Sequence, residues 1–266
     1  KSFALENEID EIYYAMPLTY TQQIKDLVDF ADQHLIRFKV VPDFSGFPLR
    51  RVNIDFFDNV PILSFRKEPL KDTINRVVKR VFDLVFSFIV IVFLLSWMFP
   101  LIAILIKISS RGPILFRQKR SGLDNNEFWC YKFRSMSQNT DADTKQATRQ
   151  DSRITTIGKF LRRTSLDEFP QFWNVLVGDM SVVGNRPERQ FFIDQIMQKA
   201  PHYKRLQKIK PGITSWGQVK YGYAENVDEM VERLQYDLLY LENISIMLDL
   251  KILIYTVIIM LQGRGK

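Results

Sequence analysis

One uncharged stretch, residues 84–106, most constrains what this chain can fold into. It reads LVFSFIVIVFLLSWMFPLIAILI and runs for 23 residues, which is long enough for a helix to cross a bilayer. A helix in a soluble core seldom stays apolar on all sides for so long, because one of its faces usually meets water. The sequence therefore predicts a segment that inserts into a membrane.

Two features of this segment argue against a straight span. Pro100 leaves the carbonyl of Ser96 without its usual helical donor, which favours a kink or break nearby. Both ends are also flanked by basic residues: Lys79 and Arg80 before the segment, and Lys107, Arg111, Arg117, Lys119 and Arg120 after it. Because Lys and Arg favour the cytoplasmic side, both ends are best placed there. We therefore expect a re-entrant helix–break–helix over residues 71–110, with a straight span as the alternative.

Residues 1–70 predict a small α/β module. "DEIYYAMP" and "IRFKVVPDF" are rich in strand-forming residues, and "TYTQQIKDLVDFADQHL" between them carries apolar residues at helical spacing. "VPILSF" predicts a third strand. The β-α-β order suggests part of a parallel, doubly wound sheet, so we expect a partial Rossmann-like module. The stretch contains no G-x-G-x-x-G motif, and we predict no dinucleotide site in it.

Residues 111–266 form the third predicted part, a mainly α-helical domain at the membrane surface. "ENVDEMVERLQYDLLYLEN" predicts a helix with an apolar stripe. The tail "ISIMLDLKILIYTVIIML" contains Asp249 and Lys251, so its uncharged part is too short to span and predicts an interfacial helix. Residues 137–153 have almost no apolar content and predict a mobile surface loop.

Charge and cysteine content narrow the function classes. The formal net charge of +7 favours an acidic partner: a nucleic acid, an anionic membrane or a phosphorylated small molecule. The single cysteine, Cys130, excludes an internal disulfide and a cysteine zinc site, and is expected to be a small buried side chain. The two histidines, His34 and His202, lie in no metal-ligand spacing. Because the basic residues gather beside the apolar segment and no nucleic-acid motif is present, we expect no nucleic-acid partner.

Asp167 and Glu168 are adjacent carboxylates within "RRTSLDEFPQFWNVLVGDMSVVGNRPER". One interpretation is structural, since Ser165 and Glu168 fit an S-x-x-E capping box. Pro170 would then fall just beyond the first turn and cost a hydrogen bond, so a helix start nearer Asp167 or Glu168 suits it better. On this interpretation the pair only begins a helix.

The other interpretation of this pair is chemical. A carboxylate can attack phosphorus to form an acyl-phosphate, which divides one hard transfer into two easier ones. Cations must then neutralise the phosphates, and the forked guanidinium of arginine can bind two oxygens at once. Four arginines are close in sequence: Arg162, Arg163, Arg186 and Arg189. The same arginines could equally form a basic face under an anionic membrane.

Four ordered segments decide between these interpretations. They are "RGPILFRQKRSGLDNNEFWCYKFRSM", "SLDEFPQFWNVLVGDMSVVGNRPER", "KPGITSWGQV" and "YDLLYLENISIMLDLKILIYTV". In this order after a basic-flanked apolar hairpin, they resemble the bacterial sugar transferase family, the monotopic polyprenyl-phosphate phosphoglycosyl transferases. The resemblance covers roughly residues 71–266, and residues 1–70 look like the nucleotide-binding-like module of the larger members.

The resemblance implies an activity, a cofactor and a location. A sugar 1-phosphate is expected to move from a UDP-sugar to undecaprenyl phosphate with release of UMP, through a covalent aspartyl-phosphosugar intermediate and with Mg²⁺. Such a step initiates exopolysaccharide, capsule or O-antigen assembly on the cytoplasmic face of the bacterial inner membrane. A homodimer is compatible with this resemblance, and the sugar is not readable. The alternative is a non-enzymatic, membrane-anchored component of a polysaccharide assembly machine.

The resemblance also implies roles for individual residues. Asp167 corresponds to the nucleophile and Glu168 to its partner, and both are candidate metal ligands. A one-step transfer would instead make Asp167 a base. Further residues are expected near the nucleotide or its phosphates: Arg186, Pro187 and Glu188 of the RPE turn, Arg134 of the KFRSM segment, Arg162 and, more weakly, Arg117 and Gln118. Similar members commonly have proline where Asn185 lies, which puts the stiffness of that turn in question more than its role.

Overall fold

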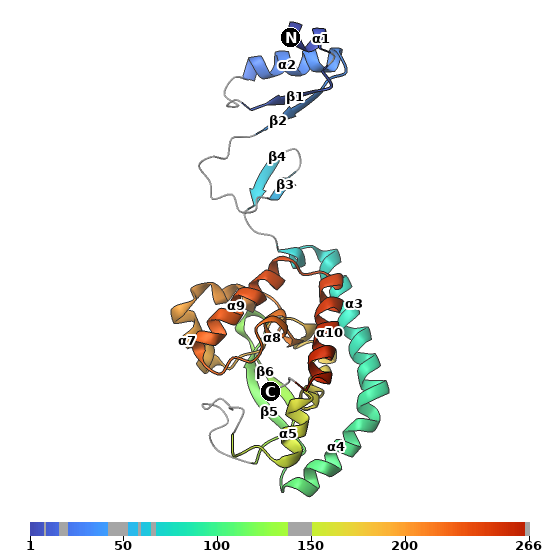
Figure 1. Ribbon diagram of the computed structural model, residues 1–266, viewed down its shortest axis with the longest axis vertical. Coiled ribbons are helices and arrows are strands. Elements are labelled where there is room, and N and C mark those ends of the chain that lie inside the picture. Colours follow the sequence, from blue (N-terminus) through green and yellow to red (C-terminus); the bar gives the residue numbers. More distant parts are fainter. Residues whose placement is uncertain are drawn as a thin grey trace. The chain divides into compact units, whose positions relative to one another are not determined.

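The computed structural model describes residues 1–7, 9–15, 21–41, 53–57, 60–64, 68–137 and 151–263. The chain divides into two compact units, Lys1–Arg66 and Lys67–Lys266. Figure 1 colours both along the sequence. Most of the predicted surface loop, residues 138–150, lies outside the described residues.

The first unit contains the predicted β-α-β element. It begins with α1 (Ser2–Glu6), and β1 (Glu11–Tyr14) then pairs in parallel with β2 (Arg37–Val40) across the connecting helix α2 (Thr21–Gln33). Phe30 and Ala31 of α2 pack with Ala4 and Ile36 in a small core. This confirms the predicted strand–helix–strand order.

The third predicted strand, however, does not join a parallel sheet. It is β4 (Val60–Ser64), and it pairs antiparallel with β3 (Asn53–Phe57). Only residues 58 and 59 separate the two strands, and so short a connection permits a hairpin but no crossover. The expectation of a doubly wound sheet is therefore wrong for this strand, and the Rossmann-like assignment rests on the β1–α2–β2 element alone.

A long apolar helix opens the second unit. After a short 3₁₀ turn, η1 (Pro69–Lys71), it comprises α3 (Thr73–Val90), a π-helical turn η2 (Ile91–Leu95) and α4 (Ser96–Ser109). The Asp72 carboxylate begins it by accepting a hydrogen bond from Ile74 N at 2.9 Å. Within the described residues, this 37-residue run is a helix that is long enough and apolar enough to cross a membrane. Only 22% of its most apolar window is buried. Most of this apolar surface is therefore not covered by the described residues.

The predicted break in this helix is a bend. Pro100 lies inside α4 and has no N–H to donate to the carbonyl of Ser96, and the π-helical turn lies directly before Ser96. Ser96 Oγ donates to Val92 O at 2.6 Å and Trp97 Nε1 donates to Phe93 O at 2.8 Å, so side chains satisfy carbonyls of the widened turn. The chain stays helical throughout, and Figure 1 shows it changing direction between α3 and α4.

The rest of the second unit is mainly helical, as predicted. This part begins with an antiparallel hairpin of β5 (Leu115–Ser121) and β6 (Glu127–Phe133), which are joined through η3 (Leu123–Asn125). Further along the chain, β7 (Ser181–Val183) pairs in parallel with β8 (Gly212–Thr214). The remaining elements are α5 (Thr156–Arg163), η4 (Leu166–Glu168), α6 (Gln171–Val177), α7 (Gln190–Lys199), η5 (Pro201–Lys208), α8 (Trp216–Lys220), α9 (Val227–Glu242) and α10 (Ile246–Leu261).

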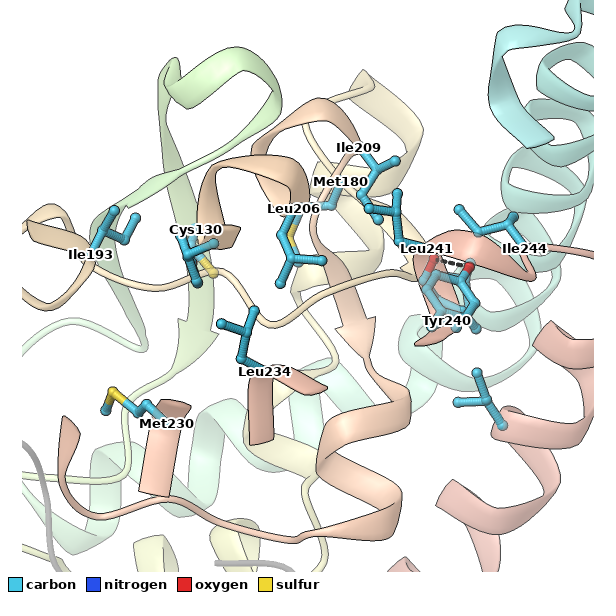
Figure 2. Packing of buried hydrophobic residues seen from close by; sticks show 14 of the residues in the cluster. Cys130, Met180, Ile193, Leu206, Ile209, Met230, Leu234, Tyr240, Leu241 and Ile244 are labelled. Carbon is cyan, nitrogen blue, oxygen red and sulfur yellow. Dashed lines mark hydrogen bonds between the residues drawn. The ribbon is translucent and has the colours of Figure 1, made fainter. Parts of the chain in front are cut away.

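These elements enclose one large core. Figure 2 shows Met180, Leu206 and Leu234 gathered in it with Cys130, which is 2% exposed. Cys130 is therefore the small buried side chain that the sequence predicts. The helix predicted around residues 225–243 is confirmed as α9, and its buried positions recur at helical spacing.

Two basic residues that were predicted to flank the membrane segment serve the interior instead. Lys79 Nζ donates to Asp249 Oδ2 at 2.7 Å and to Asp83 Oδ1 at 3.2 Å, which ties α3 to α10. Arg80 donates to the carbonyls of Val175 and Leu176 at 2.7 and 2.9 Å, at the end of α6. Because carboxylates and helix-end carbonyls need donors when they are buried, both side chains serve contacts within the unit.

Candidate active site

The carboxylate pair lies on a tight 3₁₀ turn, η4, and not in an α-helix. Ser165 has a left-handed backbone conformation with φ of 54°, and its side chain caps nothing. The helix α6 starts only at Gln171, with Pro170 directly before it. The predicted capping box is therefore wrong, because Ser165 turns the chain instead of starting the helix. This geometry leaves Asp167 and Glu168 on a short, sharply turned segment between α5 and α6.

Asp167 and Glu168 face a cavity of about 270 Å³. Its charged and polar lining comes from α5, η4, the turn after β7, α8 and α9, and includes Arg162, Asp167, Glu168, Arg186, Gln218, Tyr223 and Arg233. An apolar wall comes from the membrane helix and the last helix: Phe86, Val90, Leu94, Leu253, Val257 and Met260. The same cavity thus joins an ionisable wall to a wall made by two strongly apolar helices.

A chain of alternating charges supports the ionisable wall. Glu168 Oε1 lies 2.5 Å from Lys132 Nζ and 3.5 Å from Arg186 Nη1. Arg186 Nε lies 3.9 Å from Glu188 Oε1, and Glu188 accepts a hydrogen bond from Arg233 Nη2 at 2.7 Å. Because these groups are largely buried, water screens their interactions little.

The neighbours of this chain fix its ionisation. Burial alone would lower the pKa of the Arg186 guanidinium, but the carboxylates of Glu168 and Glu188 outweigh it and raise that pKa. Burial would raise the pKa of Glu188, but Arg233, Arg186 and Arg120 hold it below its ordinary value. Both groups therefore remain charged at neutral pH, and the cations stay in place for an anionic ligand.

Arg162 is the remaining cation of the cavity. It comes from the last turn of α5 and is 8% exposed. Over the described ranges, no carboxylate lies within ion-pair distance of its guanidinium. A buried, uncompensated guanidinium is costly, so this position favours an anion in the cavity.

Five of the residues predicted for the site do not line the cavity. Arg134 donates to the carbonyls of Arg111 and Ser110 at 2.5 and 2.8 Å, where it closes the end of α4. Arg117 is exposed and its guanidinium lies 5.0 Å from the ring centre of Trp129. Pro187 and Glu188 form the layer behind Arg186, and the carbonyl of Pro187 accepts from Arg120 Nη1 at 3.0 Å. Gln118, the weaker candidate, accepts from Arg120 Nη2 at 2.7 Å.

The sequence prediction missed three functional candidates, Lys132, Gln218 and Arg233. Lys132 and Gln218 lie inside segments quoted for the resemblance, but nothing in their spacing marked them. Arg233 carried a readable signal. It falls on the buried stripe of α9 together with Met230 and Leu234, where a charged residue needs a buried partner.

Comparison with known proteins gives this geometry a family context. A family model described as bacterial sugar transferase matches residues 74–263. Over 257 residues the chain is 38% identical to a UDP-glucose:undecaprenyl-phosphate glucose-1-phosphate transferase of Xanthomonas campestris pv. campestris, covering 95% of this chain and 53% of that protein. The protein of the same name from Klebsiella pneumoniae is 39% identical over 257 residues, with 96% and 55% covered.

A third relative differs in its sugar. It is a UDP-N-acetylgalactosamine-undecaprenyl-phosphate N-acetylgalactosaminephosphotransferase of Aeromonas hydrophila, 39% identical over 216 residues, with 81% of this chain and 50% of that protein covered. The chain therefore spans about half the length of these three relatives.

Proposed function

The chain belongs to the bacterial sugar transferase family, and on that premise we propose that it transfers a sugar 1-phosphate from a UDP-sugar to undecaprenyl phosphate and releases UMP. The names of the relatives from Xanthomonas and Klebsiella support this reaction, with glucose as their sugar. The name of the relative from Aeromonas specifies N-acetylgalactosamine. Glucose is therefore the first sugar to test and not the only one.

The observation that carries the proposal is the composition of the cavity. A phosphorylated isoprenoid needs an apolar surface for its chain and cations for its phosphate. The cavity offers Phe86 and Leu253 from the two lipid-facing helices, and Arg162 and Arg186 beside Asp167. A soluble metabolite would not need the apolar wall, and a purely structural lipid would not need the charged wall.

We assign the nucleophile to Asp167. Its carboxylate oxygen attacks the sugar-bearing phosphorus, the bond from that phosphorus to the bridging oxygen breaks, and UMP leaves with the electron pair. An oxygen of undecaprenyl phosphate then attacks the same phosphorus and releases the Asp167 carboxylate. Burial of Asp167 at 8% exposure supports this role, because it limits hydrolysis of the acyl-phosphate.

The cations have the task of neutralising charge in both steps. Arg186 is held between Glu168 and Glu188, so its position is set before substrate arrives. Arg162 provides a charge that no carboxylate of the described residues offsets. Arg134 and Arg117 lie outside the cavity lining, and a direct phosphate contact by either would need a different arrangement of the hairpin.

The donor set is compatible with Mg²⁺. This ion is usually held by one or two carboxylates together with substrate phosphates and water. Asp167 and Glu168 offer two adjacent carboxylates, and the described part of the chain holds no cluster of three or more ligating side chains. Such a set suits a cation that arrives with the diphosphate. When bound, Mg²⁺ neutralises diphosphate charge.

We place the second unit at the cytoplasmic face of the bacterial inner membrane. The bend in the α3–α4 helix supports re-entrant insertion of residues 71–110, and the exposed apolar side chains of α10, among them Met247, Ile254 and Leu261, support an interfacial position for that helix. Residues 111–266 would then hold the site at the height of the lipid phosphate, with residues 1–70 as a separate module.

The test is UMP release by the purified chain. We expect UMP release when UDP-glucose, undecaprenyl phosphate and Mg²⁺ are all present. Without the lipid, we expect no more UMP than a single turnover produces. The Asp167→Asn variant should release no UMP and still sediment with membranes. A panel of UDP-sugars would identify the sugar. Failure of every sugar would favour the alternative of a non-enzymatic assembly component.

A further inference from the structure

Two polar atoms at the cavity lack a hydrogen-bond partner. They are Nε of Arg233 on α9 and Oε1 of Gln218 on α8, and both are buried with no partner among the described residues. Both residues line the cavity that contains Asp167. Buried polar atoms are nearly always paired, so an orphaned donor and an orphaned acceptor beside one cavity indicate a ligand that supplies both partners.

The surroundings hold these two residues in place. Arg233 is 4% exposed, and its Nη2 is fixed by Glu188 at 2.7 Å. Gly217, which directly precedes Gln218, donates its backbone N–H to Asp237 Oδ1 at 2.8 Å. A Cβ at Gly217 would lie 2.7 Å from Arg233 Cγ. The two helices therefore meet closely here.

The two orphaned atoms demand complementary chemistry. Nε–H of Arg233 can only donate, and Oε1 of Gln218 can only accept. A lipid monophosphate near neutral pH is mostly a dianion that offers acceptors alone, so it would leave Gln218 unpaired. A nucleotide sugar carries hydroxyl groups and a uracil imide, and each of these places a donor beside an acceptor. The pair thus suits the donor substrate and not the acceptor.

We propose that Gln218 and Arg233 form a recognition subsite for the nucleotide-sugar donor. The two side chains contact a hydroxyl group or the uracil imide of that substrate. The subsite rests on the proposed function for its substrate class. It assigns α8 and α9 to donor selection and leaves the apolar wall of α3 and α10 to the lipid.

Two variants test the subsite kinetically. Gln218→Leu removes the acceptor at similar size, and Arg233→Lys keeps the charge opposite Glu188 but removes Nε. In a two-step reaction, kcat/KM for the donor reports only the first step. We expect each variant to lower kcat/KM for UDP-glucose about tenfold and to leave kcat/KM for undecaprenyl phosphate within about twofold. An unchanged kcat/KM for UDP-glucose, or an equal fall in kcat/KM for undecaprenyl phosphate, would overturn the subsite.

A matched control removes another ion pair of α9. Arg205 Nη2 contacts Glu242 Oε1 at 2.7 Å, and neither residue lines the cavity. Arg205→Gln should leave both kcat/KM values unchanged. A fall in donor kcat/KM equal to that of Arg233→Lys would show that the effect comes from loosening α9, and would overturn the subsite.

Binding measurements separate this proposal from the proposed function. Gln218→Leu should weaken binding of UDP-glucose to the unreactive Asp167→Asn protein, measured by calorimetry without lipid. Equal weakening for UDP would identify the uridine half as the contact, and weakening for UDP-glucose alone would identify the sugar. Unchanged binding of both ligands would contradict the subsite. Wild-type protein that binds UDP-glucose but forms no lipid product would count against the proposed function alone.

Discussion

Lys119 and Lys132 lie on the same β-hairpin and each pairs with a glutamate, yet only one pair belongs to the site. Lys119 Nζ lies 3.1 Å from Glu127 Oε2, and both side chains are about half exposed. Lys132 Nζ lies 2.5 Å from Glu168 Oε1 in a mostly buried setting. Exposed pairs are worth little and buried ones are costly to break, so the two lysines should differ sharply in effect.

We predict that Lys132→Met lowers UMP release at least about tenfold, because Glu168 loses its nearest cation beside Asp167. Lys119→Met is the matched control and should retain the wild-type rate. Rates measured at saturating substrates, with melting temperatures for both variants, would check this. If the Lys132→Met variant released UMP at the wild-type rate, this would contradict a role of Lys132 in positioning Glu168.

Much of the site could be predicted at this scale, for a physical reason. Asp167, Glu168, Arg162 and Arg186 come from one short stretch, and the structure brings all four to one cavity. Arg134 could not be placed, because its partners are backbone carbonyls at the end of α4, and such contacts leave no pattern in side-chain chemistry. Gln218 and Arg233 come from two different helices, so their proximity depends on how α8 packs on α9.

At the scale of elements, the first turns of α3 join parts of the second unit that lie far apart in sequence. Lys79 joins α3 to α10 through Asp249, a residue 170 positions away. Tyr240 OH also donates to Asp249 Oδ1 at 2.7 Å, which brings α9 into the same contact. Flanking charge predicted a membrane-surface role for Lys79, because a sequence gives no sign of a partner so remote. The same helices provide the apolar wall of the cavity.

We predict that Lys79→Met destabilises the protein by about 3 kcal/mol or more, because it leaves two buried carboxylates without their cation. Thermal unfolding in detergent should show a melting temperature lower by roughly 5–10 °C. Lys107→Met, at the exposed far end of the same helix, should leave the melting temperature within a degree or two. Equal shifts for the two variants would contradict an internal role for Lys79.

Some elements could be read from the sequence and others could not. Apolar periodicity predicted α2 and α9, because their apolar positions recur every three to four residues, whereas apolar content predicted α10. The S-x-x-E pattern failed at Ser165, since the left-handed backbone there redirects the chain. The β3–β4 hairpin was missed because a short apolar strand carries no sign of its pairing direction.

On the scale of the whole molecule, the account depends on how the second unit meets the bilayer. The helix Thr73–Ser109 is long enough to span, but its bend at the π-helical turn and Pro100 allows it to return. A re-entrant course would keep the cavity, which α3 and α10 line, at the membrane surface. A straight span would carry Ser109 and the following hairpin to the opposite side.

Labelling of the two helix ends distinguishes these courses. In a Cys130→Ala background, Thr73→Cys and Ser109→Cys both introduce an exposed thiol. We predict that a membrane-impermeant maleimide labels both positions from the cytoplasmic side of sealed vesicles, since both ends of a re-entrant helix lie there. Labelling from opposite sides would overturn the re-entrant insertion and with it the location of the site.

Mass spectrometry of the protein after incubation with UDP-glucose and Mg²⁺, without lipid, tests the central claim most directly. The account predicts that a peptide containing Asp167 gains the mass of one phosphosugar, that added undecaprenyl phosphate removes it, and that Asp167→Asn never acquires it. A wild-type enzyme that turns over with both substrates but carries no such adduct, or an adduct on another residue, would contradict it.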